Sequence, residues 1–156
     1  MQPHSLNQKE IAEVSEKLRC IRKKPPANLD MQFEKAHDAV FAEMDCLTCA
    51  NCCKSASPMI FEKDIERLSK HLKLKPGAFI EQFLFLDTDG IFAFRQIPCS
   101  FLGSDNYCSV YEHRPKACRE YPHTNMRKMH TLLKLAEKNL HICPAVAKIV
   151  ACIENA

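Results

Sequence analysis

Cys46-Leu47-Thr48-Cys49-Ala50-Asn51-Cys52-Cys53 places four thiols within eight residues, and the rest of the chain is best interpreted around this segment. A spacing of two residues between cysteines lets a turn direct both sulfur atoms at one metal centre, and the segment repeats this spacing twice. The adjacent residues Cys52 and Cys53 cannot both turn their side chains onto one tetrahedral ion without strain. The pattern therefore predicts two neighbouring metal sites or one polynuclear site.

Six further cysteines bring the total in the 156-residue chain to ten. Four of these six fall in predicted loops or at a helix start, and together with the first segment they supply enough thiolates for two four-thiolate sites, or for one cluster with spare thiols. The other two, Cys20 and Cys152, lie inside predicted helices and are interpreted as small buried packing residues. The predicted metal ligands are Cys46, Cys49, Cys52, Cys53, Cys99, Cys108, Cys118 and Cys143.

The chain begins without an apolar signal segment, and no stretch reaches the ~18 consecutive apolar residues that a membrane-spanning helix needs. We therefore expect a cytoplasmic protein with no membrane association, in a compartment where stable disulfides are rare. Disulfides stay an alternative because ten is an even number, although four thiols in eight residues would form strained or trivial bridges. The net charge of +3 is too small to indicate binding to nucleic acid.

Two metals suit these cysteines. The triple C-x-x-C-x-x-C resembles the start of the bacterial ferredoxin run, and Cys143-Pro144 resembles its remote cysteine, so an iron–sulfur cluster is slightly favoured. Zinc is favoured by the division of eight thiols into two closed tetrahedral sets. His123 and His141 lie near predicted ligands and are further candidates.

Two arginines, Arg114 and Arg119, bracket Cys118. Their guanidinium groups would offset the negative charge of a thiolate-rich site through charge-assisted hydrogen bonds. For either one alone, an ordinary solvated pair with Glu112 or Glu120 is the preferred interpretation.

Apolar periodicity predicts a mainly α fold with small β-hairpins, in a single compact cysteine-rich metal-binding domain. Its parts would be N-terminal helices in residues 1–45, the cysteine-cluster region in 46–145 and a C-terminal helix in 146–156. Turn sequences at 87–90 and 103–106 predict hairpins, the second of which would bring Cys99 near Cys108. The expected helices span residues 6–23, 29–44, 61–72, 79–84, 114–121, 129–140 and the segment from Pro144 onward.

Three motifs in a fixed order resemble the CxxCxxCC cysteine-cluster family, also called YkgJ-like, over about residues 44–145. They are the first cysteine segment, Pro98-Cys99-Ser100-Phe101-Leu102, and the stretch from Tyr107 to Pro122. Arg114, Pro115, Arg119 and Pro122 match the arginine–proline segment of that family. One departure is Asn106, where relatives often have an Asp-Gly turn, but asparagine also tolerates the left-handed conformation.

The resemblance implies a zinc- or iron-chelating domain with the eight cysteines as its ligand set. Some relatives are labelled flagellin lysine N-methylases, but only three glycines are present, and none forms a Gly-rich nucleotide-binding loop. We expect a metal-binding protein acting in electron transfer or metal handling, with no enzymatic activity on its own. The alternatives are a lysine N-methylase-related or thiol redox enzyme, and a structural zinc module that binds another protein.

Overall fold

A computed structural model describes residues 6–155 of the chain. The chain divides into two compact units. The helical unit comprises Met1–Cys46 and Pro122–Ala156, and the cysteine unit comprises Leu47–Tyr121. The arrangement expected from the sequence, in which residues 1–45, 46–145 and 146–156 are parts of one domain, stays a prediction.

The helical unit contains α1 (Gln8–Lys23), α2 (Leu29–Glu43), the 3-10 turn η2 (Met129–Thr131), α8 (Leu133–Asn139) and α9 (Pro144–Ala151). Asn7 and Glu10 exchange hydrogen bonds of 2.9 Å at the start of α1, which satisfies two amide groups that the helix leaves without partners. Pro144 begins α9, where its missing N–H costs nothing. The predicted helices of this unit are confirmed, except that residues 129–140 form a 3-10 turn followed by a shorter helix.

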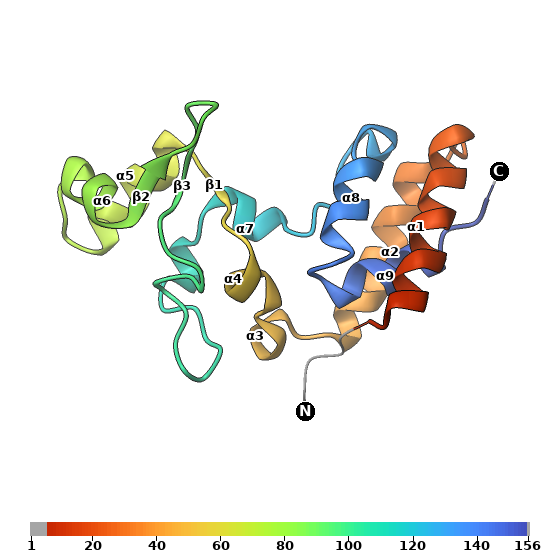
Figure 1. Cartoon of the computed structure of the whole chain (residues 1–156), viewed down its shortest axis with the longest axis horizontal. Helices are drawn as coiled ribbons and strands as arrows, with labels where there is room; N and C mark the ends of the chain where they lie inside the picture. The colour runs from red at the N-terminus through yellow and green to blue at the C-terminus, as the bar shows by residue number, and fades with distance from the viewer. Residues whose placement is uncertain (1–5, 156) are drawn as a thin grey trace. The chain divides into compact units, whose positions relative to one another are not determined.

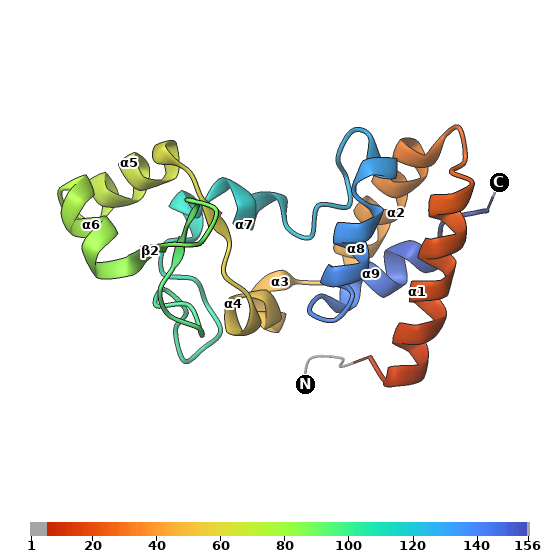
Figure 2. The ribbon, with the colours of Figure 1, turned by 45° about the horizontal axis from the view of Figure 1, so that its top comes forward.

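The apolar faces of α1, α2, α8 and α9 pack together around one core (Figures 1 and 2). Fifteen buried hydrophobic residues form that core, among them Phe33, Met129 and Ile149. Asp30 lies in the first turn of α2. Its carboxylate accepts hydrogen bonds from the amides of Lys128 (2.7 Å) and Met129 (2.8 Å), so it fixes the start of η2.

The cysteine unit alternates short helices with a small sheet. Its elements are α3 (Cys46–Cys49, beginning at the last residue of the first helical segment), α4 (Asn51–Ser55), β1 (Met59–Ile60), α5 (Glu62–His71), α6 (Pro76–Phe83), β2 (Leu84–Leu86), β3 (Phe92–Phe94), η1 (Tyr111–His113) and α7 (Lys116–Glu120). A core of eight buried residues, including Leu68, Phe79 and Phe101, lies between the sheet and α5–α6.

The sheet has the order β1-β3-β2 with both pairs antiparallel. Asp87 closes the hairpin between β2 and β3, since its carboxylate accepts from the amides of Asp89 (2.8 Å) and Ile91 (2.9 Å). Gly90 takes a φ of +76° in this turn. The predicted hairpin is therefore confirmed, and β1 is a third strand that the sequence did not indicate.

Helices dominate the described chain and its one small sheet is antiparallel, so the predicted mainly α class with small β-hairpins is confirmed. Pro115 precedes α7 instead of occupying its first turn. Cys20 lies in α1 as expected, whereas Cys152 directly follows the end of α9. Both are exposed, so their interpretation as buried packing residues was wrong. None of the helices within residues 6–155 combines the length and apolar character that crossing a membrane requires.

Candidate metal centre

Cys52 and Cys53 lie on α4, which follows α3 after one reversal of the chain. Ala50 makes that reversal in the left-handed region, with φ 53° and ψ 14°. The pKa of the Cys53 thiol is raised well above its ordinary value. The larger cause is a hydrogen bond with the neighbouring Cys52 thiol, and the second is burial. The carbonyl of Cys53 also accepts a 2.8 Å hydrogen bond from the amide of Cys99, which ties α4 to the next cysteine-bearing segment.

Cys99 and Cys108 flank the second predicted turn. The backbone pairs Leu102 with Cys108 in an isolated antiparallel bridge, and the amide of Gly103 donates to the carbonyl of Tyr107 at 2.8 Å. Asn106 has a φ of 65°, which confirms that asparagine supplies the left-handed position. The Leu102–Cys108 bridge brings the two segments together, and the charge of Cys108 raises the pKa of Cys99, so the prediction that this turn brings Cys99 near Cys108 is confirmed.

Cys118 lies on α7, and a buried carboxylate of α5 holds the start of that helix. Asp64 accepts from the amide of Lys116 at 3.0 Å and from the guanidinium of Arg67 at 2.7 Å. The other oxygen of Asp64 accepts from the amide of Phe61 at 3.0 Å, at the start of α5. One carboxylate thus fixes both the helix that carries Cys118 and the helix that packs on the core.

Four of the predicted ligands come together as a group that we call the four-thiol centre: Cys53, Cys99, Cys108 and Cys118. Each thiol of this group interacts electrostatically with each of the other three. Burial, together with the charges of the other three thiols, raises the pKa of Cys118 to about 12. Burial also raises the pKa values of Cys99 and Cys108. Burial thus disfavours the thiolate forms of these cysteines, and a bound cation would favour them.

Backbone amides are directed at two of these sulfur atoms. The N–H groups of Phe101 and Leu102 donate to Cys99, and the N–H of Val110 donates to Cys108, which in each case lowers the pKa of the thiol against the effect of burial. Amides that point at a sulfur atom stabilise its thiolate form and are common around metal-bound cysteines. Both loops are thus shaped to support a thiolate.

Arg114 supplies the positive charge nearest this group. Its guanidinium lies 3.8 Å from the centre of the Tyr111 ring and donates to the carbonyl of Tyr111 at 2.9 Å. That charge lowers the pKa of both Cys108 and Cys118. The solvated ion-pair interpretation is therefore wrong for Arg114, which faces the thiols.

Comparison with known proteins identifies the family. The model of the CxxCxxCC family, described as a putative zinc- or iron-chelating domain, matches residues 45–144. The chain belongs to the CxxCxxCC family. Membership supports metal binding in general, with zinc and iron both consistent with the family description. No curated protein and no solved structure gave a match to the chain.

The other cysteines predicted from the CxxCxxCC pattern lie outside the four-thiol centre as the structure shows it. Cys49 ends α3. Cys52 contacts the centre through the hydrogen bond between its thiol and that of Cys53. Cys46 is exposed at the start of α3, and Cys143 precedes α9 with its side chain packed on the helical core. Between residues 6 and 155, no three side chains of His, Cys, Asp or Glu are arranged so that they could hold a metal ion, and this finding includes the thiols of the four-thiol centre.

The candidate histidines of this CxxCxxCC chain take separate positions. His123 has a left-handed φ of 61°, and His141 is exposed, with its amide bonded to the carbonyl of Lys138. His113 stacks on His71 with a centroid distance of 4.1 Å. A metal-binding role for His123 or His141 stays a prediction.

Sequence reasoning missed Asp64, the residue that positions α7. Its only sequence signal was an acidic residue three positions after Phe61, the spacing at which a carboxylate reaches back to a helix start. That the same carboxylate also holds Lys116, 52 residues away, is a tertiary contact that no local pattern contains.

Proposed function

We propose that this chain binds zinc or iron through the four-thiol centre, and that the bound metal stabilises the cysteine unit. The observation that carries the proposal is the mutual interaction of all four thiols, which come from α4, the two flanks of one turn, and α7. Four cysteines from separate segments are the donor set of a closed tetrahedral site.

Metal binding would change these thiols in two ways. The cation would displace their protons, since a coordinating thiol is deprotonated, and it would draw the four sulfur atoms toward one point. The amides at Cys99 and Cys108 and the guanidinium of Arg114 would then stabilise the resulting negative charge.

The stabilising role is supported by how little else holds this unit together. Its core has eight buried residues and its strands have two or three residues each. Units of this size usually need disulfides or a metal to supply the missing free energy of folding. A structural metal site would contribute that energy directly.

Cys49 and Cys52 are proposed as further ligands in the cysteine unit, and the ligand roles of Cys46 and Cys143 stay predictions from the sequence. An iron–sulfur cluster acting in electron transfer is the second candidate function, and the C-x-x-C-x-x-C spacing favours it. A thiol redox enzyme is less well supported, because a nucleophilic cysteine needs a lowered pKa, and burial raises the pKa values of Cys99, Cys108 and Cys118.

The test is elemental analysis with an absorption spectrum on protein purified without oxygen. We expect at least one zinc or iron per chain; iron with acid-labile sulfide and visible absorption would indicate a cluster, and colourless zinc a structural site. Cys118→Ser should lower metal content and stability, whereas Cys20→Ser, at an exposed helical position, should change neither. Equal metal content in both variants would contradict the assignment of Cys118 to the centre.

A further inference from the structure

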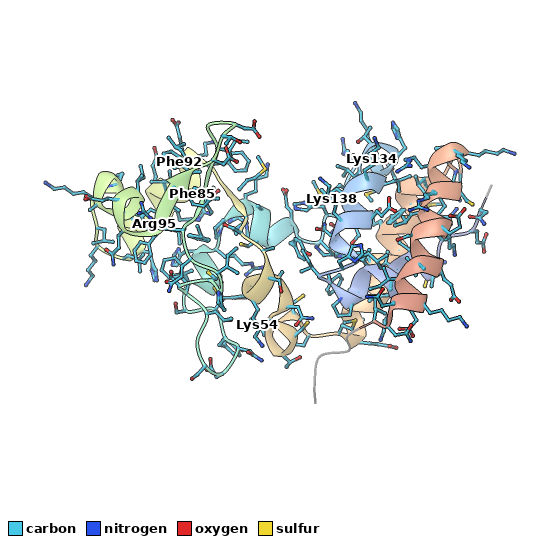
Figure 3. All side chains as sticks on the ribbon, viewed as in Figure 1. Lys54, Phe85, Phe92, Arg95, Lys134 and Lys138 are labelled. Carbon is cyan, nitrogen blue, oxygen red and sulfur yellow. The ribbon has the colours of Figure 1, made fainter. Side chains whose placement is uncertain are left out.

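One face of the small sheet is apolar and open to solvent. Met59, Ala93 and Phe85 are directly paired across β1, β3 and β2, so their side chains lie on the same face. Met59 is 46% exposed and Phe85 is 44% exposed. The opposite face carries Ile60, Leu84 and Phe94, which are buried in the core. Figure 3 labels Phe85 on this sheet.

Phe61 continues this apolar face beyond the end of β1. Its backbone is extended, with φ −97° and ψ 163°, so its side chain alternates with that of buried Ile60 and follows the side of Met59. Phe61 is 47% exposed, and it also lines a cavity of about 470 Å³. The apolar face and the cavity therefore share one residue and form a continuous surface, which we call the Phe61 surface.

The cavity end of the Phe61 surface is basic. Phe61 is joined there by four cationic and two acidic residues: Lys63, Arg67, Lys116, Arg119, Glu62 and Asp64. Asp64 is already neutralised by Arg67 and two amides. Lys63 and Arg119 have no ion-pair partner among residues 6–155, and the Nζ of Lys116 lies 3.8 Å from Glu120. The cavity thus presents positive charge to a ligand.

We propose that the Phe61 surface binds an acidic peptide segment of another protein, with an apolar side chain on Met59 and Phe85 and carboxylates on Lys63 and Arg119. Exposed aromatic and methionine side chains beside arginine are the composition that protein interfaces favour. Complementary charge at the cavity would fix the register of the bound segment.

A peptide fits this surface better than a nucleic acid strand does. Exposed aromatics beside cations could also stack bases. The acidic residues Glu62, Asp87 and Asp89, however, lie at the same end of the sheet as Phe61. Ile60 pairs with Phe92 in the antiparallel register, so Phe61, which follows Ile60, and Ile91, which precedes Phe92, are at one end. They would repel a continuous phosphate backbone, whereas a peptide can place its carboxylates individually.

Fluorescence anisotropy with the metal-loaded full chain tests this proposal with three defined probes. These are a labelled eight-residue peptide of alternating leucine and glutamate, the same peptide with glutamine in place of glutamate, and an eight-nucleotide oligothymidine. We expect the acidic peptide to bind roughly tenfold more tightly than the glutamine peptide, since exposed charge contacts contribute modestly to affinity. We expect no binding of the oligothymidine.

Matched variants locate the contact. Lys63→Glu should weaken binding of the acidic peptide roughly fivefold and Phe85→Ser roughly tenfold. Lys134→Glu, on α8 of the helical unit (Figure 3), should leave binding unchanged. Metal content and circular dichroism verify that each variant is folded, and Met59→Ser replaces Phe85→Ser if the latter is not.

Three results would overturn the proposal. Equal binding of the glutamine and glutamate peptides would remove the role of the basic cavity. Tighter binding of oligothymidine would make this a nucleic acid surface. If Lys134→Glu weakened binding as much as Lys63→Glu does, the binding would depend on the overall charge of the protein and not on the Phe61 surface.

Discussion

Asp64 shows how much one side chain organises in the cysteine unit. Its carboxylate is only 2% exposed and accepts hydrogen bonds from two amides and a guanidinium. Burial alone would raise its pKa, but these three donors outweigh burial and hold the pKa of Asp64 below its ordinary value. The charged form is therefore part of the folded structure.

Replacing Asp64 with asparagine should destabilise the chain by about 2 kcal/mol, because buried donors lose a charged acceptor. The lowered pKa gives a pH dependence of known sign. Asp64 contributes stability above the unfolded pKa of about 3.9, and this contribution is lost as pH falls through the lower folded pKa. Urea unfolding should thus show wild type and Asp64→Asn converging at acid pH. The exposed neighbour Glu66→Gln serves as control, and a constant difference down to pH 2.5 would contradict the argument.

We expect Arg114 to strengthen metal binding through the charge of its guanidinium group, without a role in stabilising the fold. Its guanidinium faces Cys108 and Cys118 while it stacks on Tyr111. Arg114→Gln should lower metal affinity roughly tenfold, as losses in the shell around ligands commonly do. Competition with a chromophoric chelator measures this, with Arg127→Gln as the matched exposed control. An unchanged affinity for Arg114→Gln would show that the thiols need no such partner.

At the scale of elements, helices were predictable and the short strand was not. Pro25-Pro26, Pro76 and Pro144 mark helix ends and starts because proline lacks an amide donor, and these signals are local. Strand β1 has two residues and pairs with β3 more than 30 positions away, so no periodicity could reveal it. A segment this short is strand only because the hairpin is there to pair with it.

The exposure of Cys20 has a similarly simple cause. Leu18 and Ile21 define the buried stripe of α1, and Cys20 is rotated about 200° from Leu18 at 100° per residue, which places it on the opposite side. The sequence predicts that Cys20 lies in a helix, but its exposure follows from the side of α1 on which it lies.

The turn between Cys99 and Cys108 depends on one left-handed residue. Asn106→Val should destabilise the chain by about 1 to 2 kcal/mol, since a β-branched side chain is strained at a φ of 65°. Asn106→Gly keeps the backbone freedom and should be near neutral. Urea denaturation of both variants measures this, and a neutral Asn106→Val would show that the turn can adopt another conformation.

At the scale of the whole molecule, the two units differ in how much apolar core each contains. Fifteen buried residues stabilise the helical unit and eight stabilise the cysteine unit, among the described residues. Stripping the metal with a chelator should therefore release amide protection in residues 47–121 while largely sparing the helical unit. Hydrogen exchange with mass spectrometry measures this. Equal loss of protection in both units would mean that the metal does not act on the cysteine unit specifically.

The sequence identified the candidate ligands but not their grouping. The spacing of the cysteines does not distinguish Cys52 from Cys53. On α4, however, successive side chains are about 100° apart. Of these two residues, Cys53 is the one that interacts with Cys99, Cys108 and Cys118. The turn that brings Cys99 near Cys108 is local and was predicted, whereas the contact of Asp64 with Lys116 and the pairing of β1 with β3 are long-range. The roles of Cys46, Cys49 and Cys143 as ligands stay predictions.

The exposed positions of Cys20 and Cys152 also affect how this protein behaves in the laboratory. Two surface sulfhydryls on a small chain can form covalent dimers in air, and such dimers would imitate a native assembly on a sizing column. Replacing both with serine should reduce the formation of such dimers, and Cys46 is then the remaining exposed thiol. The same two sulfurs then become attachment points for spectroscopic labels when they are restored one at a time.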